Sequence, residues 1–218
     1  MRLKDVILRK ATIADCRNLS ELKRDVWITT YSGIYPQEKM DGYDVDKNES
    51  SMNSSEKAMV ENRIRALLGA EKIRFGRSID VIWIALKGTD GRDYALHPRA
   101  FFRVCDENRV LVTNYDMYRL LPEYETDAED EDAWDVQGHN FFDDWAKRFN
   151  DEYSDTVTVS SVAVKENGDL TISFSNSMAL EILIETTTDC ECWRFFEYHG
   201  TDRHLVITGK GIKSQEGE

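Results

Sequence analysis

Two stretches of this 218-residue chain repeat the same succession of short β-strands, and this repetition restricts the fold more than any other feature. The first stretch runs from residues 81–86 to 109–112, and the second runs from 170–174 to 204–207. In each, two strands are followed by an aromatic strand that contains an arginine, then by a turn and a final strand. We interpret the pattern as the duplication of a unit of about four strands.

Apolar and polar residues alternate from about residue 71 onward, with many Val, Ile, Phe and Thr residues, which is typical of β-strands. The dipeptide Asn167-Gly168 predicts a tight hairpin turn, because both residues tolerate a positive φ. One helix is expected at 140–153, with Phe141, Phe142, Trp145 and Phe149 on a face that must pack against a sheet. The expected strands cover residues 72–75, 80–86, 100–104, 110–113, 156–164, 170–174, 179–184, 193–198 and 204–208.

These elements predict an α+β fold in which a short β-α-α element precedes a duplicated, mainly antiparallel β-domain with one packed aromatic helix. We expect an N-terminal fragment at 1–47, a polar linker at 48–55, the β-rich domain at 56–210 and a disordered tail at 211–218. A helix should begin after Ser55, with Met59, Ile64, Leu67 and Leu68 on its apolar side. The short strand at 6–9 would expose an edge, so we expect it to pair with the β-domain or with a second copy of the chain in a homodimer.

The chain carries 41 acidic and 28 basic residues, and its net charge of -13 argues against nucleic acid or an anionic membrane as a partner. A basic protein partner fits this charge better, and the acidic run at 123–135 is either its docking site or a solvated loop. The sequence shows no apolar stretch long enough to span a membrane and no signal peptide. With four scattered cysteines in addition, the cytoplasm is the expected compartment.

The sequence contains no recognisable catalytic constellation. There is no Gly-x-Ser-x-Gly motif and no phosphate-binding glycine loop, so we assign no catalytic residue. Cys190 and Cys192 lie near two histidines, but their spacing fits no zinc site and we expect no metal. Arg103 and Arg194 recur at equivalent places in the two repeats, as a structural ion pair or as a duplicated anion site. The binding candidates are Arg103, Arg194, His97, His139 and Trp193.

The segments Ile-Leu-Arg-Lys-Ala-Thr-Ile-Ala-Asp at 7–15 and Val-Trp-Ile-Thr-Thr-Tyr-Ser-Gly-Ile-Tyr-Pro at 26–36 resemble the opening of GCN5-related N-acetyltransferases. In that family this stretch forms the first strand and the first two helices, which border the acceptor pocket. The resemblance implies acetyl-CoA as cofactor and Trp27, Tyr31 and Tyr35 as acceptor-side residues. The family's pyrophosphate-binding turn is not found after Pro36, so we interpret the segment as a fused or truncated fragment.

The segments Tyr-Ala-Leu-His at 94–97, Phe-Arg-Val at 102–104, Asp-Val-Gln-Gly-His-Asn at 135–140 and Cys-Trp-Arg-Phe-Phe at 192–196 are similar to a family of small uncharacterised bacterial proteins, some of them associated with immunity-type or phage-linked neighbourhoods. This resemblance covers about residues 60–208 and implies a bacterial origin. Together, these observations favour a non-catalytic binding or interaction module, which could be immunity-like, without a cofactor. The alternative is an acetyl-CoA-dependent N-acetyltransferase. A hydrolase that uses His97 or His139 is a third alternative without any spacing to support it.

Overall fold

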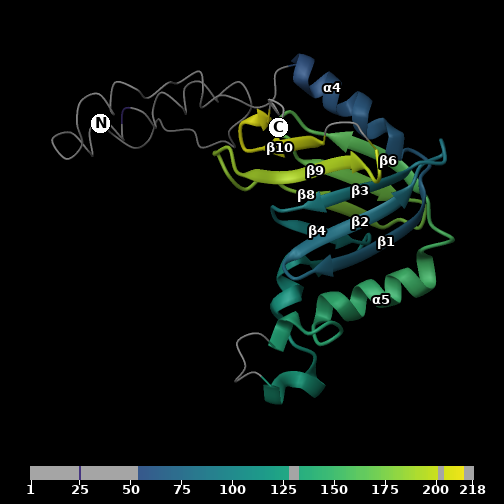
Figure 1. Ribbon diagram of the computed structural model, residues 1–218, viewed down its shortest axis with the longest axis vertical. Coiled ribbons are helices and arrows are strands. Elements are labelled where there is room, and N and C mark those ends of the chain that lie inside the picture. The colour runs from purple at the N-terminus through teal and green to yellow at the C-terminus, as the bar shows by residue number, and fades with distance from the viewer. Residues whose placement is uncertain (1–24, 26–53, 128–132, 201–203, 214–218) are drawn as a thin grey trace, which may run out of the picture. The chain divides into compact units, whose positions relative to one another are not determined.

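The computed structural model describes Asp25 and residues 54–127, 133–200 and 204–213 (Figure 1). The chain divides into two units, Met1–Ser50 and Ser51–Glu218, and only Asp25, which is helical, is described in the first. The expected β-α-α element and the strand at 6–9 therefore lie outside the described residues, as does most of the linker. Helix α4 begins at Ser54, inside the segment expected to be linker.

The first half of the second unit consists of a helix followed by five strands. Val60 and Ile64 of α4 are buried, but Met59 and Leu68 are 54% and 48% exposed, so their prediction on the apolar side was wrong. Strand β3, which is not among the strands expected from the alternation, is six residues long. The elements are α4 Ser54–Ile64, η3 Arg65–Leu67, β1 Glu71–Ser78, β2 Val81–Lys87, β3 Asp93–Pro98, β4 Phe102–Cys105 and β5 Val110–Thr113.

The second half repeats this order after a segment of short 3-10 helices. The predicted hairpin at Asn167-Gly168 is present, with Gly168 at a φ of 94°. Strand β11 lies where the disordered tail was expected to begin, because its two residues pair with β10. The elements are η4 Asn114–Tyr118, η5 Pro122–Asp127, η6 Ala133–Asp135, α5 Phe141–Tyr153, β6 Val159–Val164, β7 Leu170–Phe174, β8 Ala179–Ile182, β9 Glu191–Glu197, β10 Leu205–Thr208 and β11 Gly211–Ile212.

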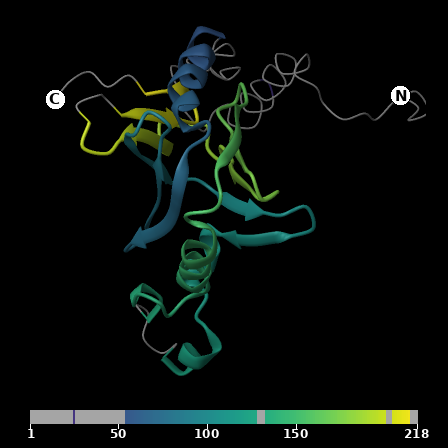
Figure 2. The ribbon, with the colours of Figure 1, turned by 90° about the vertical axis from the view of Figure 1, so that its right-hand side faces the viewer.

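The strands form two antiparallel sheets that face each other, so the predicted α+β class with mainly antiparallel strands is confirmed (Figure 2). One sheet has six strands in the order β1-β2-β3-β9-β10-β11, and the other has five in the order β5-β4-β8-β7-β6. The inner faces supply the core, with Phe75, Ile84 and Leu96 from one sheet and Phe102 and Ile172 from the other. The core therefore forms between the sheets, as in other sandwiches.

The two halves of the unit occupy the sheets in a reciprocal way. Strands β1 to β3 of the first half join β9 and β10 of the second, and β6 to β8 of the second join β4 and β5 of the first. If the two halves were exchanged, the strands of each sheet would therefore take the places of the corresponding strands in the other sheet. The register extends this correspondence to residues, because Arg194 faces His97 between β9 and β3 whereas Arg103 faces Glu181 between β4 and β8. The equivalence of Arg103 and Arg194 expected from the sequence agrees with this topology.

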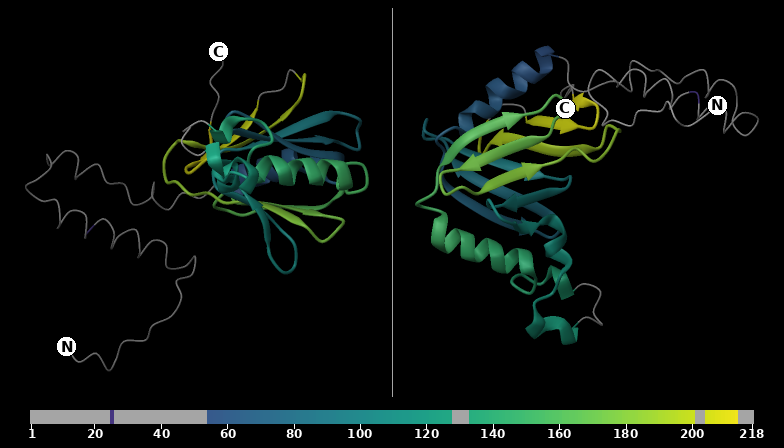
Figure 3. Two further views of the ribbon diagram at one scale, coloured as in Figure 1. Left: turned by 90° about the horizontal axis from the view of Figure 1, so that it is seen from below. Right: turned by 180° about the vertical axis from the view of Figure 1, so that it is seen from behind.

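Helices α4 and α5 lie at the open sides of the sandwich (Figure 3). Helix α5 packs against the edge strands β1 and β5, and α4 packs against β6. Phe75 of β1 contacts Trp145 and Phe149 edge to face, with ring centroids 5.0 and 4.8 Å apart. The Asn150 side chain also bonds the backbone N–H and C=O of Phe75, at 2.9 and 2.8 Å. Helix α5 thus covers the edge of β1 and satisfies backbone groups that an open edge would leave unpaired.

A buried arginine attaches the segment between β5 and α5 to the sheet. The Arg77 guanidinium donates to both carboxylate oxygens of Asp143, at 2.9 and 2.8 Å, and to Asp135 Oδ1 at 2.9 Å. It also donates to the carbonyls of Ile79 and Trp134, both at 3.0 Å. Burial opposes the charged form of Arg77, but the hydrogen bonds with the two aspartates outweigh it and raise its pKa.

None of the described helices combines the length and the apolar character needed to cross a membrane.

Candidate functional site

The sequence-based candidates lie in different parts of the structure. Trp193 is 0% exposed, and its indole N–H donates to the Gly168 carbonyl at 2.9 Å. This position in the core removes Trp193 from the binding candidates, because β9 turns it toward the interior. His139 stacks on Tyr124 with ring centroids 3.8 Å apart, in the segment before α5. Trp27, Tyr31 and Tyr35 lie outside the described residues.

Both candidate arginines form ion pairs. Arg103 Nε donates to Glu181 Oε2 at 2.6 Å, and Arg194 Nε donates to Glu191 Oε1 at 2.6 Å. Hydrogen bonding to these carboxylates raises the pKa of each guanidinium. Burial tends to raise the pKa of Glu191, but the bond from Arg194 outweighs it and the pKa is lowered. Neither arginine is therefore free to form a simple anion site, and the structural ion pair is the alternative that the geometry favours.

His97 lies on the outer face of the six-stranded sheet among aromatic side chains. Its ring contacts Phe196 edge to face, with centroids 5.0 Å apart, and His204 stacks on the same Phe196 ring with centroids 4.1 Å apart. Arg194 is opposite His97 in the register of β3 and β9. The structure thus brings His97 and Arg194 together, whereas His139 and Arg103 lie on other elements.

A pocket of about 670 Å³, here called the sheet-face pocket, opens on this outer face. Its floor is low because Ala85 and Ala95 have short side chains. Trp83 lies flat over Gly76, where an added Cβ would come within 2.2 Å of the indole atom Cζ2. Only a glycine allows this close approach of the ring to the β1 backbone. The lining residues are Lys72, Arg74, Trp83, Ala85, Leu86, Lys87, Asp93, Tyr94, Ala95, His97 and Tyr198.

The rim of the sheet-face pocket is basic. Lys72 and Arg74 form no ion pair within the described part of the chain, although Arg74 Nε donates to the Ser154 hydroxyl at 3.4 Å. Lys87 lies 3.7 Å from Asp93, which is a loose and exposed pair. A volume of this size, with aromatic walls and a few charged groups, is typical of ligand pockets. The pocket therefore favours an anionic ligand with an apolar or flat part.

The five-stranded sheet provides an internal comparison for this surface. Trp83 lies opposite Gly76 in the strand register, and Thr171 lies opposite Ala163 at the corresponding place in the other sheet. In the same way, Ala85 lies opposite Ala95 in one sheet and Ser173 lies opposite Ala179 in the other. The corresponding outer positions of the two sheets are thus Trp83 and Thr171, Ala85 and Ser173, His97 and Glu181, and Phe196 and Cys105. One outer face carries aromatic and imidazole rings where the other carries small polar or charged side chains. Equal solvent exposure of the two outer faces would not by itself require this difference in their side chains.

Sequence reasoning did not find Trp83 or the pocket. The run at 81–86 is almost entirely apolar, so its two faces could not be separated by polarity. In the structure, Ile82, Ile84 and Leu86 are buried and Trp83 and Ala85 face outward. A tryptophan in an outward position was the available signal, but it could be recognised only after the inward positions were known.

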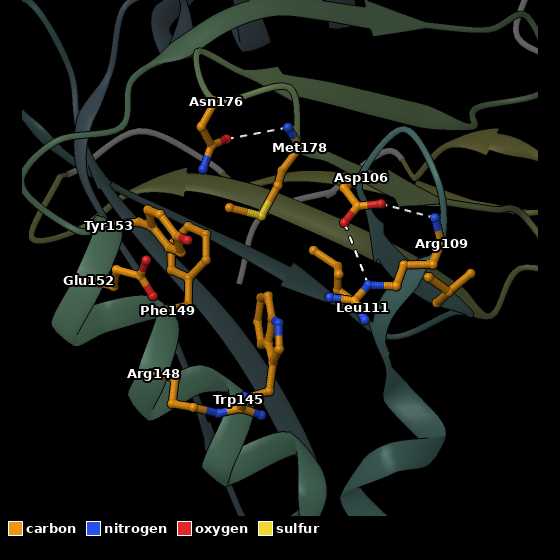
Figure 4. Close-up of a pocket in the computed structure, with 11 residues that line it drawn as sticks. Asp106, Arg109, Leu111, Trp145, Arg148, Phe149, Glu152, Tyr153, Asn176 and Met178 are labelled. Atoms are coloured by element: carbon orange, nitrogen blue, oxygen red, sulfur yellow. Dashed lines mark hydrogen bonds and ion pairs between the residues drawn. The ribbon is translucent and has the colours of Figure 1, made fainter.

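A second pocket, here called the α5 pocket, lies between α5, the β4–β5 hairpin and the turn between β7 and β8 (Figure 4). Its volume is about 480 Å³. Trp145 and Phe149 of α5 face Leu111 of β5 and Met178 across it. Arg109 and Arg148 also line this pocket, but within the described residues each is paired with an aspartate, unlike the basic side chains Lys72 and Arg74 of the sheet-face pocket. The α5 pocket is considered separately below.

Neither pocket contains a group of side chains typical of a catalytic or metal centre. Within residues 54–127, 133–200 and 204–213, no cluster of three or more His, Cys, Asp or Glu side chains could hold a metal ion. Burial raises the pKa of Cys192 to about 11 and also raises that of Cys105, so neither thiol is activated as a nucleophile.

We expect stability to fall as the pH drops below about 6.5 because of His97 and His204. Burial, and then the nearby Arg194, lowers the pKa of both imidazoles below their ordinary value. The unfolded chain thus takes up these protons at a higher pH than the folded chain, so stability is complete above about pH 6.5 and is lost as the pH falls. Urea unfolding at three pH values measures this slope. A His97→Gln/His204→Gln variant should flatten it, and a stability that rises on acidification would contradict the assignment.

No protein-family model, curated protein or solved structure matches this chain, so neither of the two family resemblances gains support from these comparisons.

Proposed function

We propose that this chain is a non-catalytic binding module that takes an acidic segment of a partner protein, with an aromatic or apolar side chain, into the sheet-face pocket. The observation that carries the proposal is the contrast between the two outer sheet faces. Corresponding positions hold Trp83 and His97 in one sheet but Thr171 and Glu181 in the other. The strands of the two sheets have the same arrangement, so the arrangement alone does not account for the aromatic and imidazole rings on one outer face. A binding role would account for them.

The chemistry of the pocket supports this partner. Aromatic residues and arginine contribute most to protein interfaces, and a flat indole offers a surface for stacking. Lys72 and Arg74 would pair with carboxylates beside the inserted side chain. The net charge of -13 suggested a basic partner, but the charge close to the pocket differs from that of the whole chain. We therefore place an acidic segment at this site, and a basic surface of the same partner could still meet the acidic run.

We infer that the two halves arose by duplication and that only one outer face gained a ligand. The reciprocal strand order and the shared register of Arg103 and Arg194 support this origin. The free thiols of Cys105, Cys190 and Cys192 support the cytoplasm as the compartment, and a bacterial source follows from the resemblance over residues 60–208. A module of this kind would recruit or neutralise its partner by binding alone, as immunity proteins do.

The test uses fluorescently labelled peptides with one tryptophan or tyrosine flanked by aspartates and glutamates. We expect fluorescence polarisation to detect their binding to the full chain, and Ala85→Arg to weaken it at least about ten-fold, because the new side chain fills the floor of the pocket. Ser173→Arg is the matched control, since it places the same side chain at the corresponding position of the other sheet. Equal effects of the two variants, or preference for lysine-flanked peptides, would refute the proposal.

The acetyltransferase alternative rests on residues 7–15 and 26–36, of which the structure describes none, so it remains a prediction. Calorimetric titration with acetyl-CoA tests it directly. Binding at micromolar affinity would make the N-terminal segment part of a working transferase, whereas no heat at millimolar concentration would remove this alternative. The result is independent of the peptide experiment, because the sheet-face pocket lies wholly in residues 72–198.

A further inference from the structure

The α5 pocket has apolar walls built from both halves of the β-domain. Phe149 and Met178 are buried, and Leu111 and Trp145 pack against the core beside them. Figure 4 shows the Trp145 indole and the Met178 side chain facing the same space, with Leu111 on its other side. The volume of about 480 Å³ is within the range of small-molecule pockets. The walls therefore suit an apolar or aromatic body.

One polar group of this pocket lacks a partner. Asn176 Oδ1 accepts a hydrogen bond from the Met178 backbone N–H at 3.3 Å, but the amide nitrogen Nδ2 is buried and bonds nothing within the described residues. In Figure 4 this nitrogen is directed toward the side of the pocket where Tyr153 and Phe149 lie. A buried donor without an acceptor is costly, and such groups in folded proteins usually have an explanation.

The corresponding hairpin of the first half satisfies its polar side chain internally. There, Asp90 Oδ1 accepts from the Arg92 backbone N–H at 3.1 Å, and Asp90 Oδ2 accepts from the Tyr94 hydroxyl at 2.7 Å. Tyr94 corresponds to Met178, since each precedes an alanine that faces the neighbouring strand at the same register. Methionine has no hydroxyl group, so the second hairpin leaves its turn amide open toward the pocket.

The charges at the mouth of the pocket are already paired. Arg109 Nε lies 3.6 Å from Asp106, and Arg148 Nη2 lies 2.8 Å from Asp144. Glu152 also lines the pocket, so its mouth has no excess of positive charge that would select an anion. Charged ligands would in addition lose their hydration against the apolar walls. The mouth thus favours an uncharged ligand.

We propose that the α5 pocket binds a small, neutral aromatic molecule that carries a carbonyl oxygen. The ring lies among Trp145, Phe149 and Met178, and the carbonyl oxygen accepts a hydrogen bond from Asn176 Nδ2. This site is independent of the sheet-face pocket and of the protein partner proposed for it, because the two pockets share no lining residue.

The experiment follows methionine methyl groups by NMR in the full-length chain labelled with ¹³C-methyl methionine. The probe is 4-phenylbutanamide, and 4-phenylbutyrate is the charged molecule of the same skeleton. We expect the Met178 methyl signal to shift and saturate with a dissociation constant of about 1 mM, as the small size of the probe implies. The methyl signals of Met59, which is exposed, and of Met117, which is buried elsewhere, should not move.

Two aspartate variants test the role of the amide. Asn176→Asp keeps the acceptor for the Met178 N–H but removes the donor, and we expect it to weaken binding of the amide about five-fold. Asn167→Asp is the matched control, because Asn167 Oδ1 accepts from Asp169 N at 3.2 Å in another hairpin turn. No saturable Met178 shift, binding of the carboxylate as tight as that of the amide, or equal effects of the two variants would each overturn the proposal.

Discussion

Replacing Arg77 by methionine is expected to lower the free energy of unfolding by about 3–5 kcal/mol, the cost of breaking a buried charge pair by removing one partner. The change leaves the Asp143 carboxylate in the interior with only the Asn140 amide and the Gly138 N–H to bond it. It also releases the side chain and the carbonyl of Asp135, which hold the segment between β5 and α5. Urea unfolding followed by circular dichroism measures the loss.

Two further variants distinguish this buried pair from an ordinary ion pair. Adding Asp143→Leu to Arg77→Met should recover part of the loss, because the unpaired buried charge is then absent. Arg148→Gln breaks the exposed pair with Asp144 on the same helix, and we expect a change within about 0.5 kcal/mol. A loss for Arg77→Met as small as that for Arg148→Gln would show that the Arg77 network does not stabilise the fold.

Replacing Trp193 by alanine is expected to cost about 3–5 kcal/mol, the range for truncating a large buried aromatic side chain. Trp193 is fully buried between the sheets, and its N–H satisfies the carbonyl of Gly168 in the β6–β7 hairpin. The variant therefore loses core packing and leaves a buried acceptor unpaired. Guanidinium or urea unfolding by circular dichroism is suitable, because this readout does not depend on the removed fluorophore.

Trp83→Ala is the matched control, since it truncates the same residue type on the outer face of the same sheet. We expect a loss of about 1 kcal/mol, because Trp83 covers Gly76 on one side only and remains partly exposed. Peptide binding should show the opposite order if the sheet-face pocket is the binding site, with Trp83→Ala the more damaging of the two. Similar losses of stability for both variants would mean that Trp83 is a core residue.

The elements that the sequence predicted well are those specified by neighbouring residues. Asn140 accepts the Asp143 backbone N–H as the N-cap of α5, close to the predicted start of the aromatic helix. Asn167 and Gly168 form a hairpin turn because their local conformations require no distant contact. Arg103 and Arg194 hold corresponding register positions in the two sheets, and this was visible because both follow the same order of strands along the chain. These features depend on separations of a few residues, which periodicity and turn chemistry describe.

The candidate site depends on which strands pair and on which of their side chains face outward, and no local sequence pattern specifies either. Arg77 and Asp143 are separated by 66 residues, and nothing near either one indicates the other. Trp83 and Trp193 both lie in apolar strands, and only the pairing of the strands shows which of them faces the core and which faces solvent.

The sequence by itself thus determined the class of fold, the repeated order of strands and the position of the aromatic helix, because hydrophobic period and turn residues act locally. Only the tertiary structure decided how the halves exchange strands between two sheets. That exchange places β3 beside β9 and β4 beside β8, and so brings His97 to Arg194 and Glu181 to Arg103. Side-chain direction alternates along a strand, so a face and its pocket exist only once the register is set.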